Sequence, residues 1–370
     1  MLNDTKGSKE LFKEVIESGL CTLCGACAGS CPYLVTHKGR PVLVDNCLLN
    51  DGQCYQHCPR TLTDMSAIST HVFGVPYNDD EIGTAKEVLI SRSTDARIKE
   101  RAQYGGTVTA LLSLALSEGL IDGAVVAGIS EEKIPTGLIA KSAEAILEHA
   151  GSSYMVCPVL EAYNRVPMDE DCRLGIVTLP CQALALRKMQ ADPPQNRFNI
   201  ANVKLIIGLF CTWALSPDGF HRFLKENLDL TQVKKFDIPP PPASEFNVYS
   251  DAGKTSFSLD EIRKYIMSGC HYCPDMTAEF ADISVGAAEG IEGWNTVIVR
   301  TDAGAELMGI ARDKGKMEVD VLPPENLAHL KEASLLKKKR ALAEIINKSG
   351  DKSNLLYLGM PKDVVDNLLR

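Results

Sequence analysis

Hydrophobic and polar positions along the chain predict first a short helix and then an alternation of strands and helices. Residues 8–19 carry hydrophobic side chains at helical spacing and end on Gly19, a common helix terminator. From Glu87 onward, EVLISRS and IDGAVVAG are strand-like, and YGGTVTALLSLALSEG between them is helical. Two apolar runs of buried-strand length, RLGIVTLPC and NVKLIIGLFC, flank a further helical segment, QALALRKMQ. This alternation predicts an α/β (mixed α+β) body with at least some parallel strands.

The same pattern divides the chain into three units. Residues 1–75 hold the short helix and a segment rich in cysteine and glycine, which needs an inorganic core to fold because it can bury little apolar surface. Residues 76–310 form the α/β body, in which the proline run at 239–242 predicts a loop. We expect residues 311–370 to form a charged helical tail, with KKKR at 337–340 on a solvent-exposed helix face.

Composition and charge narrow the class of protein. The 370 residues carry a formal net charge of −9, which argues against a nucleic-acid-binding protein, whose affinity depends on clustered Lys and Arg. The beginning of the chain, MLNDTKGSKE, lacks an apolar leader, and the longest apolar run, LIIGLFCTWAL, is too short to span a bilayer. We therefore expect a cytoplasmic protein without a membrane span.

Cysteine usage indicates iron–sulfur chemistry in the first unit. Seven of the thirteen cysteines precede residue 60, and a reducing compartment makes metal ligation a better explanation than disulfides. CTLCGACAGSCP places Cys21, Cys24, Cys27 and Cys31 in the C-x2-C-x2-C-x3-C-P run of bacterial ferredoxins, whose fourth cysteine ligates the other cluster. Structural zinc is a poorer match, because zinc sites separate two C-x2-C pairs by a long spacer. The first cluster should therefore take Cys21, Cys24, Cys27 and Cys58.

The second cluster of this unit lacks one cysteine. Its ligands should include Cys31, Cys47 and Cys54, from CLLNDGQCYQHCP, and Asp51 falls at the vacant position if the usual spacing is stretched by one residue. Asp51 could ligate that iron, the iron could be absent and leave a 3Fe–4S cluster, or an exogenous ligand could bind. Alternatively, Asp51 only begins a turn with Gly52.

The body contains four further cysteines that could meet. Cys181 and Cys211 close the two apolar runs, so parallel strands would bring both to the carboxyl edge of the sheet, where α/β proteins bind ligands. Cys270 and Cys273 form a C-x2-C pair, and the four thiolates suffice for a third 4Fe–4S cluster. Alternatively, the two single cysteines are buried small hydrophobes and the pair is a redox dithiol, and composition alone favours this explanation for the single cysteines.

Two glycine-rich turns are weaker candidates for a cofactor site. Gly105 and Gly106 precede a helix, where backbone N–H groups are free to face a ligand. EGIEGWNTVIVRT supplies Trp294 and Asn295 just before a strand. Neither turn carries a dinucleotide fingerprint or a P-loop, and either could be only a turn.

Taken together, these segments resemble one family, the beta subunits of coenzyme F₄₂₀-reducing hydrogenases and formate dehydrogenases with their relatives, including plant-type hydroxymethyl-chlorophyll reductase. The resemblance covers roughly residues 87–305 and rests on the order and spacing of these stretches: ISRSTDARIKERAQYGGTVTALLSLALSEGLIDGAVV, GIVTLPCQALALRK, IIGLFC, IRKYIMSGCHYCPDMTAEFADISVG and EGWNTVIVRT. Residues 1–60 look like the ferredoxin-like extension of longer members.

The resemblance implies a flavin-binding body in which FAD lies beside a 4Fe–4S cluster. It makes Cys181, Cys211, Cys270 and Cys273 the expected cluster ligands, which reverses the preference from composition. It also identifies the expected flavin surroundings as Tyr104, Gly105, Gly106, Thr107, Gly293, Trp294 and Asn295.

The function implied is electron transfer between a hydride carrier at FAD, such as reduced coenzyme F₄₂₀, and a partner redox subunit, through two to three clusters. The partner would be a hydrogenase, a formate dehydrogenase or a heterodisulfide-reductase-like protein. Three alternatives stay open. They are a ferredoxin-driven flavin reductase of an organic substrate, a flavin-free electron-transfer subunit and a zinc-stabilised assembly module.

Overall fold

The computed structural model describes residues 6–45, 47–130, 133–167, 171–194, 200–239 and 243–370. Its strands are β1 (Leu34–His37), β2 (Arg40–Leu43), β3 (Thr63–Asp64), β4 (Glu87–Ser93), β5 (Gly123–Ile129), β6 (Pro135–Ala140), β7 (Leu174–Thr178), β8 (Val203–Leu209), β9 (Val233–Asp237), β10 (Glu245–Ser250), β11 (Gly253–Ser258), β12 (Ile283–Ala287), β13 (Asn295–Val299), β14 (Met317–Val321) and β15 (Leu358–Gly359).

Its α-helices are α1 (Ser8–Leu11), α2 (Gln53–Gln56), α3 (Met65–Phe73), α4 (Ala96–Arg101), α5 (Thr107–Ser117), α6 (Ala143–Glu148), α7 (Val159–Asn164), α8 (Pro180–Ala191), α9 (Pro217–Asn227), α10 (Leu259–Arg263), α11 (Asp302–Asp313), α12 (Pro324–Ser349) and α13 (Lys362–Leu369). A π-helical turn, Phe12–Ile16, extends α1, and Gly19 follows with a φ of 79°, so the expected first helix is present. No helix of the described residues is long and apolar enough to cross a membrane.

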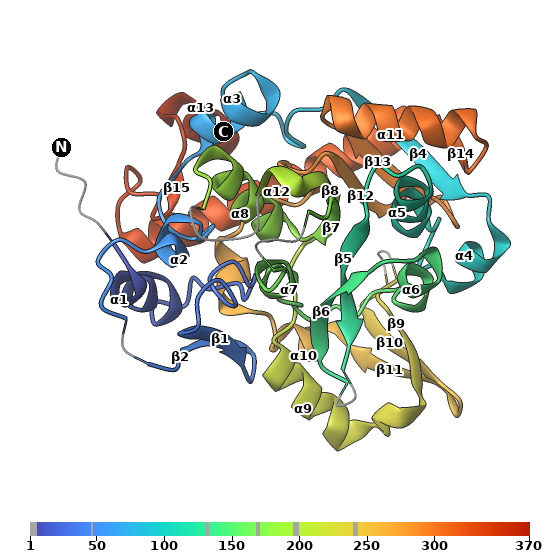
Figure 1. The fold of residues 1–370 in the computed structure, drawn as a ribbon, viewed down its shortest axis with the longest axis horizontal. Coiled ribbons are helices and arrows are strands. Elements are labelled where there is room, and N and C mark those ends of the chain that lie inside the picture. The colour runs from blue at the N-terminus through green and yellow to red at the C-terminus, as the bar shows by residue number, and fades with distance from the viewer. Residues whose placement is uncertain (1–5, 46, 131–132, 168–170, 195–199, 240–242) are drawn as a thin grey trace.

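An eight-stranded mixed sheet forms the centre of the body, in the order β14-β4-β13-β12-β8-β7-β5-β6 (Figure 1). Strands β5, β7, β8 and β12 are parallel neighbours, whereas β13 is antiparallel to both β12 and β4. Strand β4 therefore runs in the same direction as the four parallel strands. The carboxyl ends of these five strands lie at one edge of the sheet, and the predicted α/β class with parallel pairing is confirmed.

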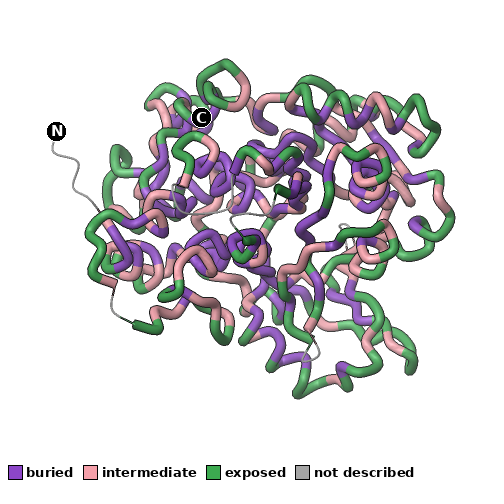
Figure 2. The backbone as a smooth tube through the Cα atoms, in the orientation of Figure 1, coloured by how far each residue is buried: buried purple, intermediate pink, exposed green. Residues whose placement is uncertain are grey.

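Apolar side chains cover both faces of this sheet. In β8, Ile206 and Ile207 are fully buried on opposite faces, because successive side chains of a strand alternate. Ile206 belongs to the core under α8, where Leu186 also lies, whereas Ile207 belongs to the core under α5, which includes Leu111. The buried residues accordingly run through the middle of the molecule (Figure 2). Burial on both faces explains why the parallel strands appear in the sequence as continuous apolar runs.

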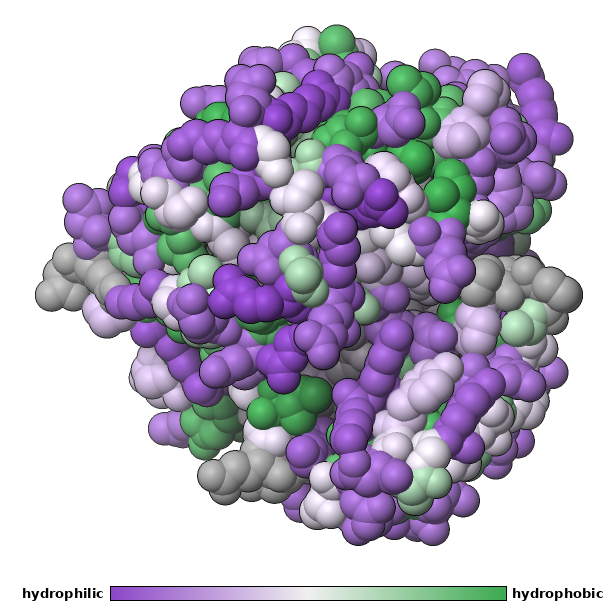
Figure 3. Space-filling model, turned by 90° about the vertical axis from the view of Figure 1, so that its right-hand side faces the viewer, coloured by the Kyte–Doolittle hydropathy of each residue, from purple (hydrophilic) through white to green (hydrophobic). Residues whose placement is uncertain are grey.

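A smaller layer adjoins the main sheet. Strands β9, β10 and β11 form a three-stranded antiparallel sheet that lies beside α9 and α10 (Figure 1). Phe220, Phe223 and Phe246 form its aromatic core. Seen from the side of α4 and β14, the surface of the molecule is mostly hydrophilic, and its hydrophobic side chains gather in small groups (Figure 3).

The segment 311–370, expected as a charged helical tail, is helical in α12 and α13 but also supplies strands. Strand β14 pairs with β4 as an edge of the main sheet, and β15 pairs with β3 of the N-terminal unit. The expectation for KKKR is wrong for its first two residues, since Lys337 is 3% exposed and Lys338 is fully buried. These ammonium groups can be buried because polar groups of the body accept hydrogen bonds from them, for example the Asp275 carbonyl from Lys337 and the Tyr77 hydroxyl from Lys338. Residues 240–242 of the predicted proline loop lie outside the described residues.

Candidate functional site

Four N-terminal thiols meet in one cavity. Cys21, Cys24, Cys27 and Cys58 all line it. Burial raises the pKa of the Cys21 thiol to about 11, and the nearby Cys58 adds to the shift. Burial also raises the pKa of the other three thiols, and neighbouring thiols contribute for Cys24 and Cys27. The structure therefore brings together the four residues expected to hold the first cluster, in a place where four bare thiolates would be costly without a compensating cation.

The backbone packs closely around these thiols. The N–H groups of Leu23 and Arg60 donate to the sulfurs of Cys21 and Cys58, both at 3.4 Å. Gly25 has a φ of 87°, and a Cβ there would lie 2.7 Å from the backbone nitrogen of Glu161. Only glycine allows the cysteine loop to approach the body this closely.

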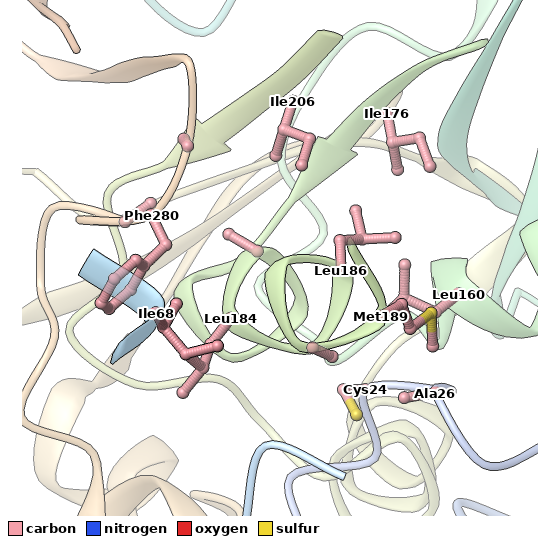
Figure 4. Packing of buried hydrophobic residues seen from close by; sticks show 14 of the residues in the cluster. Cys24, Ala26, Ile68, Leu160, Ile176, Leu184, Leu186, Met189, Ile206 and Phe280 are labelled. Carbon is pink, nitrogen blue, oxygen red and sulfur yellow. The ribbon is translucent and has the colours of Figure 1, made fainter. Parts of the chain in front are cut away.

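The cysteine loop is fixed to the body by Asn164 at the end of α7. Its side-chain amide donates to three carbonyl oxygens of the loop, those of Gly25, Ala26 and Ala28, at 3.2, 3.0 and 2.8 Å. Figure 4 shows Cys24 and Ala26 close to Met189 and Leu160, on the side of α8 that faces away from the sheet. The N-terminal unit and the body thus share one hydrophobic core.

The residues expected around the second cluster are less enclosed. Cys54 is buried close to Cys27, whereas Cys31 and Cys47 are half-buried. Asp51 is exposed, and one of its carboxylate oxygens accepts a hydrogen bond of 2.6 Å from the side-chain amide of Gln56. Ligation by Asp51 stays a prediction.

The four body thiols also come together. Cys211 follows β8, and Cys270 and Cys273 lie in and just after a short 3₁₀ turn, Ser268–Tyr272. Cys181 was expected at the end of a strand but lies in the first turn of α8, because β7 ends at Thr178 and Pro180 begins the helix. Strands β7 and β8 are parallel, so both cysteines nevertheless lie at the carboxyl edge of the sheet.

Electrostatics distinguishes Cys273 from its neighbours. Burial raises the pKa of Cys181 to about 12 and also raises those of Cys211 and Cys270, with contributions from the other body thiols. Burial opposes ionisation of Cys273 as well, but the Lys337 ammonium and the Arg60 guanidinium together bring its pKa below the ordinary value. Two buried cations therefore face the body thiols.

The two four-thiol groups are neighbours. After burial, the largest contribution to the raised pKa of Cys24 comes from Cys181, and Cys58 follows. The Thr22 hydroxyl lies beside the Cys181 thiol and lowers its pKa. Close packing at this boundary requires Gly269, because a Cβ there would lie 2.4 Å from the carbonyl oxygens of Leu20 and Cys21. Among the described residues, no three His, Cys, Asp or Glu side chains are arranged to hold a single metal ion.

The two segments expected around a flavin lie side by side at the same sheet edge. The backbone N–H of Thr107 donates to the Asn295 side-chain oxygen at 3.2 Å, and the Asn295 amide donates to the Gly286 carbonyl at 2.9 Å. Gly105 fits against Asn295, since a Cβ would lie 2.9 Å from that side-chain oxygen. The Thr107 hydroxyl also bonds the Ser91 hydroxyl at 2.7 Å.

The remaining residues of these segments are more open. Tyr104 is half-buried, and burial raises the pKa of its hydroxyl. Gly106 and Gly293 have φ values of 74°, and a Cβ at Gly293 would meet no atom within 4 Å. The Trp294 ring lies 4.5 Å from the Arg92 guanidinium carbon. The structure thus places Tyr104 and Trp294 where part of each side chain is accessible to a ligand.

Sequence reasoning missed three residues around the thiols, namely Arg60, Asn164 and Lys337. Arg60 had a signal, because it lies two residues after Cys58 in a cluster motif. Asn164 is 136 positions from Ala28, and Lys337 is 126 and 62 positions from Cys211 and Asp275, so nothing in their local sequence marks these contacts.

Comparisons with known proteins agree on one family. Its two sequence models are described as the N-terminal and C-terminal parts of the coenzyme F₄₂₀ hydrogenase/dehydrogenase beta subunit, and they match residues 88–164 and 171–325. The coenzyme F₄₂₀ hydrogenase subunit beta of Methanothermobacter thermautotrophicus is 36% identical, over 70% of this chain and 94% of that protein. The coenzyme F₄₂₀-dependent sulfite reductase of Methanocaldococcus jannaschii is 32% identical over 90% of this chain, which spans about half (51%) of that longer protein.

A solved structure is also similar. A chain in the F₄₂₀-reducing NiFe hydrogenase complex from Methanosarcina barkeri superimposes with a TM-score of 0.67 at 30% sequence identity. The match covers 73% of this chain and 94% of that one.

Proposed function

The chain belongs to the coenzyme F₄₂₀ hydrogenase/dehydrogenase beta-subunit family, and we propose that it is an iron–sulfur flavoprotein subunit of an oxidoreductase. It would pass electrons between a hydride carrier, reduced coenzyme F₄₂₀ or a similar molecule, and a partner redox subunit. The observation that carries the proposal is the close approach of two four-thiol groups, one from the N-terminal unit and one from the body, at which Cys181 packs against the core that contains Cys24.

The residues present fit iron–sulfur clusters. Arg60 is 4% exposed, its Nε has no hydrogen-bond partner, and no carboxylate among the described residues forms an ion pair with it. Burying an uncompensated cation costs roughly several kcal/mol of folding free energy, so an anionic group is expected beside Arg60. A cubane with four thiolates is anionic. Cys21, Cys24, Cys27 and Cys58 would hold one cluster, and the four body thiols another.

The residues at the carboxyl end of β4 and the beginning of β13 fit a flavin, but less specifically than the thiols fit clusters. A bound FAD would take two electrons as hydride and release them singly, which matches a hydride carrier to one-electron clusters. Asn295 fixes the Gly105–Thr107 loop at the carboxyl edge of β4, and Tyr104 and Trp294 are accessible beside it. The loop lies at the end of β4, three strand spacings from β8, or roughly 14 Å at the usual strand spacing, so the flavin and the body cluster would be neighbours.

The N-terminal unit would carry electrons onward. Its contacts with α7 and α8 hold the first four-thiol group against the body, and the half-buried Cys31 and Cys47 lie nearer the surface. An exposed electron exit has little use without an acceptor, so we propose a complex with a hydrogenase, formate dehydrogenase or heterodisulfide-reductase-like subunit. The relatives named above include subunits of such complexes.

Anaerobic purification followed by cofactor analysis tests the proposal. We expect FAD and about twelve iron atoms with acid-labile sulfide if three cubanes are present. Cys273→Ser and Cys58→Ser should each lose about one cluster's iron, whereas Cys172→Ser, which alters a buried cysteine outside these groups, should not. Iron without flavin would leave a pure electron-transfer subunit, and zinc without sulfide would indicate an assembly module.

The electron donor is identified by flavin bleaching. Reduced coenzyme F₄₂₀, NADH, NADPH and reduced ferredoxin are added in turn to the anaerobic protein. We expect bleaching by reduced F₄₂₀. Bleaching by reduced ferredoxin alone would favour a flavin reductase of an organic substrate instead.

A further inference from the structure

Arg60 lies at the boundary between the two four-thiol groups. It lines the cavity that holds Cys21, Cys24, Cys27 and Cys58, and it also lines a second cavity, to which Cys181 and Cys273 belong. Its backbone N–H donates to the sulfur of Cys58. One residue thus borders both groups.

The Arg60 guanidinium is held rigidly. It donates to the carbonyls of Gly269 and Tyr272 at 3.3 and 3.4 Å, in the turn that carries Cys270, and it stacks on the Tyr357 ring at 4.5 Å. These partners are neutral. The anionic groups that would offset the Arg60 charge are therefore the thiolates on its two sides.

Two buried lysines provide a contrast, because each faces only one group. Lys188 donates to the Cys58 carbonyl at 2.8 Å and to the Thr61 hydroxyl at 2.9 Å, on the N-terminal side. Lys337 donates to the carbonyls of Cys211 and Asp275, on the body side, the latter at 2.7 Å.

We infer that the buried charge of Arg60 raises the reduction potentials of both clusters. Lys188 raises that of the N-terminal cluster alone, and Lys337 that of the body cluster alone. The inference rests on the proposed function. Reduction adds one negative charge to a cluster, and a buried cation stabilises that charge with little screening by solvent. When one electron leaves one cluster and enters the other, the added charge stays beside Arg60. Arg60 therefore stabilises both reduced clusters without opposing transfer between them.

Redox titration of the full chain, followed by EPR, tests the inference. Cys58→Ser and Cys273→Ser assign the two signals. Arg60→Met should lower both midpoint potentials by at least about 59 mV, which for one electron corresponds to a tenfold fall in the reduced-to-oxidised ratio at a fixed potential. Lys188→Met should lower only the N-terminal midpoint, and Lys337→Met only the body midpoint. Arg60→Lys, which keeps the charge, should shift both midpoints less than Arg60→Met does.

Iron and sulfide are measured first in every variant, so that failures are distinguishable. Wild-type protein without iron would overturn the proposed function. Fully loaded Arg60→Met protein with one or both midpoints unchanged would overturn only the role of Arg60. If Arg60→Met protein does not contain its clusters, the midpoint potentials of the Arg60→Lys, Lys188→Met and Lys337→Met variants still test the inference. A single lysine variant that shifts both midpoints equally, or an Arg60→Lys variant that shifts only one, contradicts the inference.

Discussion

The side-chain oxygen of Asn295 accepts a hydrogen bond from the backbone N–H of Thr107, so that one side chain joins two segments separated by 188 positions. The Asn295 amide also bonds the end of β12 through the Gly286 carbonyl. Asn295 thus connects the strands of the sheet to the beginning of α5, where the proposed flavin site lies.

Replacing Asn295 by Ala should weaken flavin binding. The buried Thr107 N–H would lose its acceptor, which costs about 1–3 kcal/mol, or roughly 5- to 150-fold in affinity if the loop is ordered only with flavin bound. The ratio of FAD to protein after gel filtration measures the loss. Asn367→Ala, which removes an exposed hydrogen bond to Asp79, is the matched control. Equal flavin content in the two variants would contradict this role.

Replacing Asn164 by Leu should loosen the first cysteine loop. Three loop carbonyls lose their donor, and at about 1 kcal/mol for each net hydrogen bond the loop loses about 2–3 kcal/mol. We expect faster iron loss from the N-terminal cluster to a chelator, followed by absorbance. Asn227→Leu, in α9, removes a hydrogen bond within a helix and should leave the rate unchanged. An unchanged rate for Asn164→Leu would show that the loop is held by other contacts.

Asp51 should determine the EPR signal of the second N-terminal cluster. Asp51→Cys completes a four-cysteine set, and we expect the oxidised variant to be EPR-silent, because a three-iron cluster has a signal that an oxidised 4Fe–4S cluster lacks. Asp51→Ala should show the three-iron signal. Asp45→Ala serves as a control in the same loop. Identical spectra for wild type and both Asp51 variants would mean that Asp51 is only a turn residue.

The buried ion pair between Lys338 and Glu279 should be important for stability. Lys338 also donates to the Tyr77 hydroxyl at 3.0 Å, and Lys338→Met leaves the Glu279 carboxylate buried and uncompensated. We expect a loss of about 3–5 kcal/mol in the free energy of unfolding, measured by anaerobic denaturation. Adding Glu279→Gln should recover part of it. The neighbouring Lys339→Met should cost about 0.5 kcal/mol or less, and a similar cost for Lys338→Met would rule out this effect.

Acid stability should depend in part on Asp122. Hydrogen bonds from the Arg173 side chain and backbone lower the pKa of this carboxyl from 3.8 to about 2. Because the folded pKa is lowered, the contribution is fully present above pH 3.8 and is lost as the pH falls through 2. The difference in stability between wild type and Asp122→Asn should therefore shrink over this window. The effect is small, since the pair is exposed to solvent. A difference that is constant with pH would contradict it.

Much of the architecture could be predicted from the sequence because the signals are local. The apolar runs that became β7 and β8 are continuous, which is typical of parallel strands buried on both faces, and their cysteines are at the expected edge. The order of strands was not predictable. Strand β13 pairs antiparallel with β12, and β4 pairs antiparallel with β13. These pairings join segments that are distant in the sequence, and no local pattern encodes them.

The candidate site was predictable only where spacing carries chemistry. The first four thiols follow from the cysteine spacing, whereas the body thiols were assembled from three separate segments with the help of a family resemblance. The buried lysines of α12 could not be foreseen. A lysine in a charged run is usually solvated, and Lys338 is buried only because Glu279 and Tyr77, 59 and 261 positions away, face it.

The pairing of β3 with β15 has a consequence for the order of synthesis and maturation. Thr63 donates to the Tyr357 carbonyl, and the Tyr357 ring covers Arg60, between the two thiol groups. The cysteines of the first group leave the ribosome some three hundred residues before this cover exists. The surroundings of Arg60 are complete only after residues 357–359 have been synthesised, so a cluster bound beside it would be enclosed only after translation of the body.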